Sequence, residues 1–231
     1  MSVSSKNENL PVVSSENIPH EAHSTSQGNH FDTGSCSIIF GPMFSGKTTE
    51  LARQVVECAD IELSCLYINH TIDVRETEFF SSIVSSHSSG FKGISEKVEC
   101  IKVSTLNNIN IDNYDVIGID EGQFFDDIVE NVRDWVLNKN KKVIIASLDG
   151  KFNIETFGNV HRLICLCDPG GIRKLGARCK RCMLKTNTYR HYRLVPAGFT
   201  MRLVGGKSDV LVGGDDIYES VCLKCHKEHA K

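Results

Sequence analysis

The chain has 231 residues, 40% of them hydrophobic, and a formal net charge of −3. This length favours one domain of about 200 residues, or one domain with a small added module. No apolar run approaches the roughly 18 residues that a membrane helix needs, so we expect no membrane partner. The charge is uneven, because residues 35–171 carry 12 bases and 20 acids whereas residues 172–231 carry 13 bases and 5 acids. The basic C-terminal quarter and the ten cysteines therefore need an explanation.

Residues 1–34 differ from the rest in composition, being rich in Ser, Asn, His and Glu with no apolar periodicity. They contain no apolar stretch of signal-peptide length, and their acids and lack of Arg are unlike a mitochondrial transit peptide. We expect a disordered N-terminal tail and a cytoplasmic protein. In that reducing compartment, clustered cysteines indicate metal or redox chemistry before disulfides.

From Ser35 onward, short apolar runs rich in β-branched residues alternate with segments that are compatible with helices. The runs are residues 36–40, 65–68, 98–103, 116–119 and 143–148, and the clearest helical segments are 48–60 and 126–138. Such lengths and spacings are typical of buried strands in βαβ units with a parallel sheet. We predict an α/β fold over residues 35–171, followed by a separate small module over residues 172–231.

Residues 41–48 match the phosphate-binding pattern G-x-x-x-x-G-K-S/T between a predicted strand and a predicted helix. The eight residues are Gly41, Pro42, Met43, Phe44, Ser45, Gly46, Lys47 and Thr48. The glycines let backbone N–H groups point at phosphate oxygens, and the helix adds the positive end of its dipole. Lys47 is expected to reach the β/γ-phosphates and the Thr48 hydroxyl to ligate Mg²⁺. The segment predicts a P-loop that binds ATP.

A second acidic element follows the predicted strand at residues 116–119. P-loop folds place a Mg²⁺ ligand at the end of such a strand, and this role suits Asp120. Glu121 comes next, beyond the strand end, where it can face the reacting centre as a general base. A solvated strand end is the alternative for either acid.

Four cysteines form two C-x-x-C pairs in the basic region: Cys179, Cys182, Cys222 and Cys225. Two such pairs supply four thiolates for one tetrahedral structural Zn²⁺. The gap of 39 residues (183–221) is longer than is usual for this pattern and leaves room for a folded loop. His226, Cys165 and Cys167 remain competing ligands.

Four segments together resemble the type II thymidine kinases: residues 41–50 (GPMFSGKTTE), 119–125 (IDEGQFF), 148–152 (LDGKF) and 212–218 (VGGDDIY). They occur in the family's order, with the cysteine pairs around the last, and the resemblance covers residues 36 to about 226. It implies a P-loop parallel sheet with a zinc-binding lasso. It also implies transfer of the ATP γ-phosphate to the 5′-hydroxyl of thymidine, with deoxyuridine as a second acceptor.

The resemblance assigns roles to individual residues. Glu121 would take the proton of the 5′-hydroxyl, and Arg75 would neutralise developing phosphoryl charge. Asp73 and Gln123 are placed with the nucleotide site. The residues that would wall the base pocket are Met43, Phe124, Leu148, Phe152 and Phe157.

The lasso between the cysteine pairs would grip the nucleoside. Backbone groups of Leu211, Val212 and Gly213 would bond the thymine edge, and Tyr218 would close over the substrate. A base-contacting threonine of the family has no clean counterpart, Thr188 being the nearest. The segment between the pairs is longer than the family norm, and we expect an extra hairpin around residues 193–209. By resemblance, the protein would be a homotetramer inhibited by dTTP, with no nucleic-acid partner.

Two other functions fit parts of the sequence. One is a P-loop ATPase whose basic zinc module binds nucleic acid through Arg173, Lys174, Arg178, Lys180 and Arg181. The other is a zinc-stapled binding module with an inactive P-loop. The IDEGQFF segment and the Gly-Gly…Tyr lasso favour the kinase, because they serve a small nucleoside.

Overall fold

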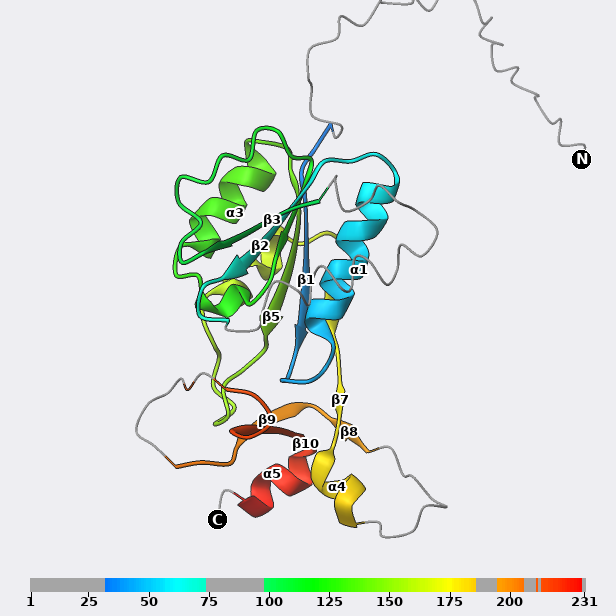
Figure 1. The fold of residues 1–231 in the computed structure, drawn as a ribbon, viewed down its shortest axis with the longest axis vertical. Helices are drawn as coiled ribbons and strands as arrows, with labels where there is room; N and C mark the ends of the chain where they lie inside the picture. The colour runs from blue at the N-terminus through cyan, green and yellow to red at the C-terminus, as the bar shows by residue number, and fades with distance from the viewer. Residues whose placement is uncertain (1–31, 74–97, 186–194, 206–210, 212, 230–231) are drawn as a thin grey trace, which may run out of the picture.

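The computed structural model describes residues 32–73, 98–185, 195–205, 211 and 213–229. Figure 1 shows two regions, a sheet flanked by helices and a smaller C-terminal module beyond the carboxyl ends of the strands. The predicted disordered tail lies almost wholly outside the described residues.

The first region is built on a six-stranded, wholly parallel sheet with the strand order β3-β2-β4-β5-β1-β6. Its strands are β1 (Ser35–Gly41), β2 (Cys65–His70), β3 (Val98–Val103), β4 (Val116–Ile119), β5 (Lys142–Leu148) and β6 (Ile172–Lys174). The five strands expected from the apolar runs are confirmed. The short exposed strand β6 carries no apolar run and was not expected. Because β6 pairs with β1, the sheet continues three residues past the predicted boundary at Gly171.

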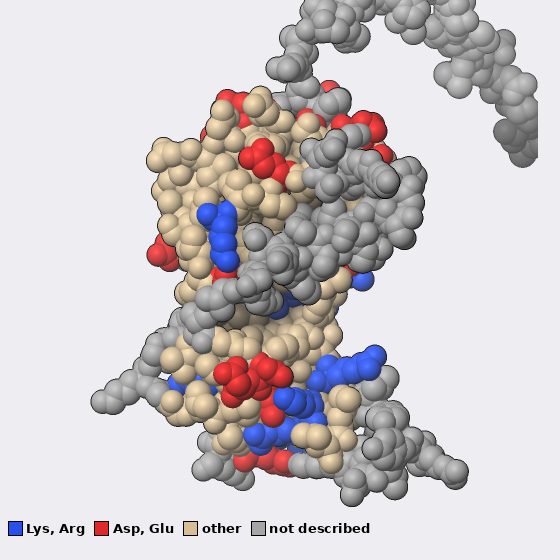
Figure 2. Space-filling view, viewed as in Figure 1, with Lys and Arg blue, Asp and Glu red and all other residues tan. Residues whose placement is uncertain are grey.

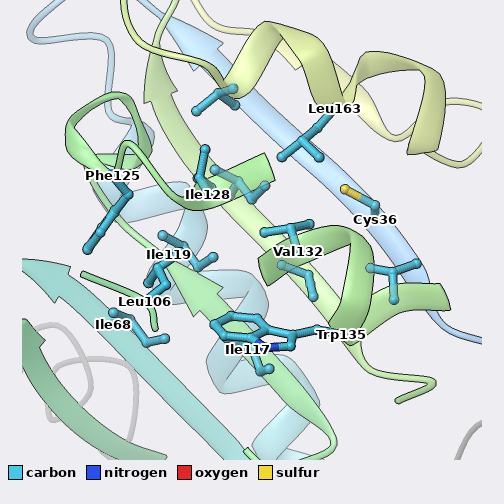
Figure 3. Close-up of a cluster of buried hydrophobic side chains, with 14 of the residues drawn as sticks. Cys36, Ile68, Leu106, Ile117, Ile119, Phe125, Ile128, Val132, Trp135 and Leu163 are labelled. Carbon is cyan, nitrogen blue, oxygen red and sulfur yellow. The ribbon is translucent and has the colours of Figure 1, made fainter. Parts of the chain in front are cut away.

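Helices cover both faces of this sheet. Helix α1 (Lys47–Asp60) packs Leu51 and Val55 on one face, and α3 (Ile128–Leu137) packs Val132 and Trp135 on the other. Figure 3 shows the second cluster, where side chains from α3 lie over Ile117 and the neighbouring strand residues. Each such buried side chain contributes about 1.5–3 kcal/mol relative to exposure.

Helix α3 begins at Ile128, two residues later than the predicted helical segment 126–138, and the contacts of Asp127 give the reason. The Asp127 carboxylate accepts hydrogen bonds from the backbone N–H groups of Leu106 (2.8 Å) and Asn107 (2.9 Å). The residue is thereby held outside the helix as its N-cap. The described part of this region also contains two 3₁₀ turns, η2 (Gly122–Phe124) and η3 (Val160–Leu166).

In the residues that the structure describes, the C-terminal module has two small antiparallel sheets and two short helices. Its elements are β7 (Ala177–Arg178), α4 (Lys180–Lys185), β8 (Pro196–Ala197), β9 (Phe199–Arg202), β10 (Tyr218–Val221) and α5 (Leu223–His229). The expected hairpin within residues 193–209 is wrong for the described part of that segment. There β8 pairs with β7 and β9 pairs with β10, because both strands find partners beside the cysteine pairs rather than each other.

None of the helices in the described ranges has both the length and the apolar character required to cross a membrane.

Candidate active site

A cavity of about 480 Å³ opens where the carboxyl ends of the strands meet the C-terminal module. Parallel sheets place ligand sites at this edge, and the volume is that of a small-molecule pocket. Residues from both regions line it: Met43, Phe44, Gly46, Lys47, Thr48, Thr49, Ile72, Asp73, Glu121, Phe124, Leu148, Gly150, Lys151, Phe152, Phe157, Thr200, Leu211, Gly213, Gly214 and Tyr218.

The P-loop has the geometry that its glycines were expected to allow. Gly46 adopts a left-handed backbone with φ 83°, and a Cβ on Gly41 would lie 2.5 Å from the Ser45 Oγ and 2.8 Å from the Leu175 carbonyl oxygen. The Lys47 ammonium donates to the Pro42 carbonyl at 2.9 Å. Backbone and lysine therefore form a compact cradle at the N-terminus of α1.

Asp120 lies at the end of β4 with only 1% of its surface exposed. Its carboxylate accepts a hydrogen bond from its neighbour Glu121 N–H (2.9 Å) and another from the Tyr67 hydroxyl (2.9 Å). Burial, together with the charge of Asp120, raises the pKa of Tyr67 well above its ordinary value. The phenol therefore stays protonated and orients the carboxylate.

Glu121 occupies a strained position beside Asp120. Its backbone is left-handed (φ 52°, ψ 40°), which costs on the order of 1 kcal/mol for a residue with a Cβ. The buried Gln123 amide donates to the Glu121 carboxylate at 2.6 Å. The Gln123 carbonyl oxygen accepts in turn from Leu148 N–H (2.9 Å) and the Ser147 hydroxyl (3.1 Å). This chain of contacts fixes the Glu121 carboxylate at the cavity against the end of β5.

The turn after β2 brings a second acid to the cavity. Asn69 donates to the Asp73 carboxylate at 3.1 Å, and the His70 Nδ1 accepts from Ile72 N–H at 3.0 Å. Burial lowers the pKa of His70, which favours the neutral ring that this acceptor role requires. Arg75 lies outside the described residues.

The five residues predicted to wall a base pocket all line the cavity. The Phe124 and Phe157 rings meet edge to face with centroids 5.4 Å apart, an arrangement that suits packing against a further planar ring. The structure brings these predicted side chains together at one cavity, although they come from the P-loop, η2, the end of β5 and the loop that follows it.

The lasso meets the cavity through Leu211, Gly213 and Tyr218. The Tyr218 hydroxyl donates to the Leu211 carbonyl (2.9 Å) and accepts from Leu211 N–H (3.2 Å). The backbone groups of Leu211 that were expected to face thymine are thus bonded to Tyr218 here. Val212 lies outside the described residues.

Thr200 is a pocket residue that the sequence reasoning missed. It lies on β9, lines the cavity, and its hydroxyl accepts from Met43 N–H in the P-loop at 3.0 Å. Thr188, considered earlier, lies outside the described residues. The sequence feature that could have indicated Thr200 is the run Phe199-Thr200-Met201-Arg202. This run forms strand β9, which pairs with the segment before Cys222.

Some further residues differ between the predicted site and the observed lining of the cavity. Those missed beside Thr200 are Thr49, Ile72, Gly150, Lys151 and Gly214. Those predicted but not among the lining residues are Gly41, Pro42 and Ser45, which frame the P-loop, and Asp120 and Gln123, which lie behind Glu121.

The four predicted ligand thiols gather in the C-terminal module, with all four sulfur atoms within 4.8 Å of one another. The Cys182 sulfur lies 3.8 Å from that of Cys222 and 3.6 Å from that of Cys225. With Zn–S bonds of about 2.3 Å, sulfurs at the corners of a tetrahedron lie about 3.8 Å apart, so the cluster fits Zn²⁺. His226, Cys165 and Cys167 are not part of this group.

Ionisation within the cluster is uneven. Burial raises the pKa of Cys179, but hydrogen bonds with the backbone of Cys222 and Cys182 outweigh it and lower the value to about 7. The hydrogen bond with Cys179 chiefly raises the pKa of Cys182 to about 12. Of these two thiols, Cys179 is therefore the better prepared to meet a metal as thiolate.

Three bases of the C-terminal quarter pair with acids of the same chain. Figure 2 shows Lys and Arg gathered with acidic side chains over the lower module. Arg173 pairs with Glu50 (2.7 Å), Lys174 with Asp149 (2.7 Å) and Arg181 with Glu219 (3.1 Å). Three of the five bases proposed for nucleic-acid contact thus have partners within the chain, and the structure offers no support for that alternative.

A P-loop beside a fixed carboxylate and an aromatic pocket defines a phosphotransferase for a small acceptor. A sequence model of the thymidine kinase family matches residues 34–226. The thymidine kinase of Amsacta moorei entomopoxvirus is 37% identical over 195 residues, covering 83% of this chain and 97% of that protein. Thymidine kinase 1 of Dictyostelium discoideum is 37% identical over 196 residues (84% and 78%), and cytosolic thymidine kinase of Bos taurus is 36% identical over 199 residues (85% and 74%). The chain belongs to the thymidine kinase family.

Proposed function

We propose that this protein transfers the γ-phosphate of ATP to the 5′-hydroxyl of thymidine, giving dTMP and ADP. The observation that carries the proposal is the common cavity of Lys47, Thr48, Glu121 and an aromatic wall. A phosphate cradle and a nucleoside-sized pocket thus meet at one carboxylate. Family membership and the names of the three relatives support thymidine as the acceptor.

In this mechanism Glu121 is the general base. As the 5′-oxygen bonds to the γ-phosphorus and the bond to ADP breaks, the hydroxyl proton passes to the Glu121 carboxylate. Gln123 holds that carboxylate through its 2.6 Å hydrogen bond, so little reorientation is needed during the reaction. Lys47 would exchange the Pro42 carbonyl for β/γ-phosphate oxygens, with Asp73 and Arg75 completing the nucleotide site.

The residues also fit a Mg²⁺ ion, which prefers hard oxygen ligands. Thr48 supplies a hydroxyl in the cavity, and the nearly buried Asp120 carboxylate is held in one orientation by Tyr67. When bound, the ion would neutralise charge on the β- and γ-phosphates. We assign Thr48 and Asp120 as its protein ligands.

The cysteine cluster would hold a structural Zn²⁺ that positions the lasso. Strand β10 leads directly from Tyr218 to Cys222, and β9 carries Thr200 into the cavity. A metal that fixes these strands therefore also fixes the groups that face the nucleoside.

The decisive assay mixes the purified full chain with Mg-ATP and thymidine and follows dTMP by chromatography. We expect dTMP formation at a rate that added DNA leaves unchanged. DNA-stimulated ATP hydrolysis without dTMP would overturn the proposal. Deoxyuridine in the same assay measures selectivity at the base.

Three further features belong to the proposal through family resemblance. dTTP would bind with its nucleoside in the thymidine pocket, so its inhibition should be competitive with thymidine. The active species would be a homotetramer, which sedimentation can measure. A cytoplasmic location would accord with the relative from Bos taurus that is named as cytosolic.

A further inference from the structure

His226 follows a predicted zinc ligand but is directed away from the cluster. It lies in α5 directly after Cys225, and its side chain is buried at 9% exposure. Its Nε2 lies 2.7 Å from the carbonyl oxygen of Phe152, in the loop after β5. A carbonyl oxygen only accepts, so Nε2 carries the hydrogen and donates it.

A second contact from the C-terminal module also holds Phe152 in place. The Arg202 guanidinium carbon lies 4.1 Å from the centroid of the Phe152 ring, a cation–π distance. Phe199, on the same strand β9 as Arg202, places its ring centroid 5.9 Å from that of His226. Backbone and ring of Phe152 are thus fixed by two elements of the C-terminal module.

These contacts join the cysteine cluster to the cavity by a short path. The His226 backbone N–H donates to the Cys222 carbonyl at 3.0 Å, so the imidazole is carried by the turn that bears two of the ligand thiols. At the other end, Phe152 lines the cavity.

We propose that His226 is a positioning residue for the nucleoside, which ties the zinc turn to the Phe152 wall of the pocket. The inference rests on the proposed placement of thymidine in this cavity. Phe152 would contact the base equally before and during phosphoryl transfer. Loss of its anchor should therefore raise the KM for thymidine and leave kcat and the KM for ATP nearly unchanged.

The test compares three variants of the full-length enzyme. His226→Leu keeps bulk but leaves the Phe152 carbonyl without its donor, and should raise the KM for thymidine about tenfold. His226→Gln places an amide N–H near the position of Nε2 and should recover most of the affinity. His229→Leu, at an exposed histidine on the same helix, is the matched control and should behave as wild type.

Zinc content, measured by atomic absorption, separates positioning from metal binding. It should stay at one ion per chain in His226→Leu, because the four thiols form the cluster without His226. Loss of zinc in that variant, or equal damage in the Gln and Leu variants, would overturn the inference.

A fourth variant separates failure of this inference from failure of the proposed site. Phe152→Ala should raise the KM for thymidine at least as much as His226→Leu. If Phe152→Ala has no effect, the proposed nucleoside site is wrong. If Phe152→Ala raises the KM for thymidine and His226→Leu does not, the proposed nucleoside site is supported and the anchoring role of His226 is wrong.

Discussion

The two regions that enclose the cavity are stabilised in different ways. The sheet region buries two apolar clusters of 18 and 13 residues, which is a core of ordinary size. Among its described residues, the C-terminal module buries a cluster of six, and two of those are the predicted ligands Cys179 and Cys225. So small a unit normally needs a metal or disulfides for stability. Chemistry on the phosphate should therefore depend on the sheet region, and the grip on the nucleoside should depend on the metal.

The largest expected effect concerns Glu121, the proposed general base in the sheet region. Glu121→Gln should lower kcat by 10²-fold or more, on the order expected for loss of such a base. Binding of ATP and thymidine should persist, because the amide keeps the size of the side chain. Steady-state kinetics and calorimetric binding measure both, and undiminished turnover would remove Glu121 from the mechanism.

The second-largest effect is expected from a change in the C-terminal module and should be confined to that module. Cys179→Ser removes one of the four thiols, so zinc content and thymidine affinity should be lost together, the affinity by about 10²-fold or more. ATP binding should survive, because the P-loop belongs to the sheet core. Cys165→Ser, at an exposed cysteine outside the cluster, is the control. Equal loss of ATP binding would show that the two regions are not separable in this way.

A smaller effect is expected for the residue that orients the base. Gln123→Ala removes the donor to Glu121 and the acceptor for Leu148 N–H, and should lower kcat about tenfold. The KM for thymidine should change little. Gln123→Glu is an informative companion to the Ala variant, because its carboxylate would repel the neighbouring carboxylate of Glu121. A purely structural role for Gln123 would instead lower the melting temperature without a specific change in kcat.

The smallest expected effect lies where the two regions meet. Thr200→Val keeps the shape of the side chain but leaves Met43 N–H without its acceptor, and should raise the KM for thymidine about fivefold. Thr200→Ser keeps the hydroxyl and should stay close to wild type. Similar behaviour of the two variants would mean that the hydroxyl makes no contribution.

The parts of the fold that were predictable share one property, which is that their signals are local. The strands showed as apolar runs, and the P-loop as a contiguous pattern between a strand and a helix. Strand β6 escaped notice because its three residues are exposed and its place depends on pairing with β1, more than 130 positions earlier in the chain. In the described part of residues 193–209 the expected hairpin was wrong for a related reason, since β8 and β9 pair with other strands.

In the candidate site, too, the residues in local motifs were predictable and the contacts between distant residues were not. Lys47, Thr48, Glu121 and the four cysteines were predicted from motifs that carry their own chemistry. Contacts across long separations could not be read from local sequence. The hydroxyl of Thr200 meets Met43 across 157 positions, and His226 meets Phe152 across 74.

The sequence by itself determined the class of fold, and it predicted the phosphate cradle, the proposed general base and the two pairs of proposed metal ligands, because each of these motifs is made of residues close together in the chain. It also showed an excess of basic residues in the C-terminal quarter, but it did not indicate what those residues contact. Only the tertiary structure decided that several of those bases pair with acids of the same chain. It likewise decided that His226 supports the pocket wall instead of joining the thiols. Ion pairs and hydrogen bonds depend on distance in space, and folding brings together groups whose separation along the chain gives no hint of it.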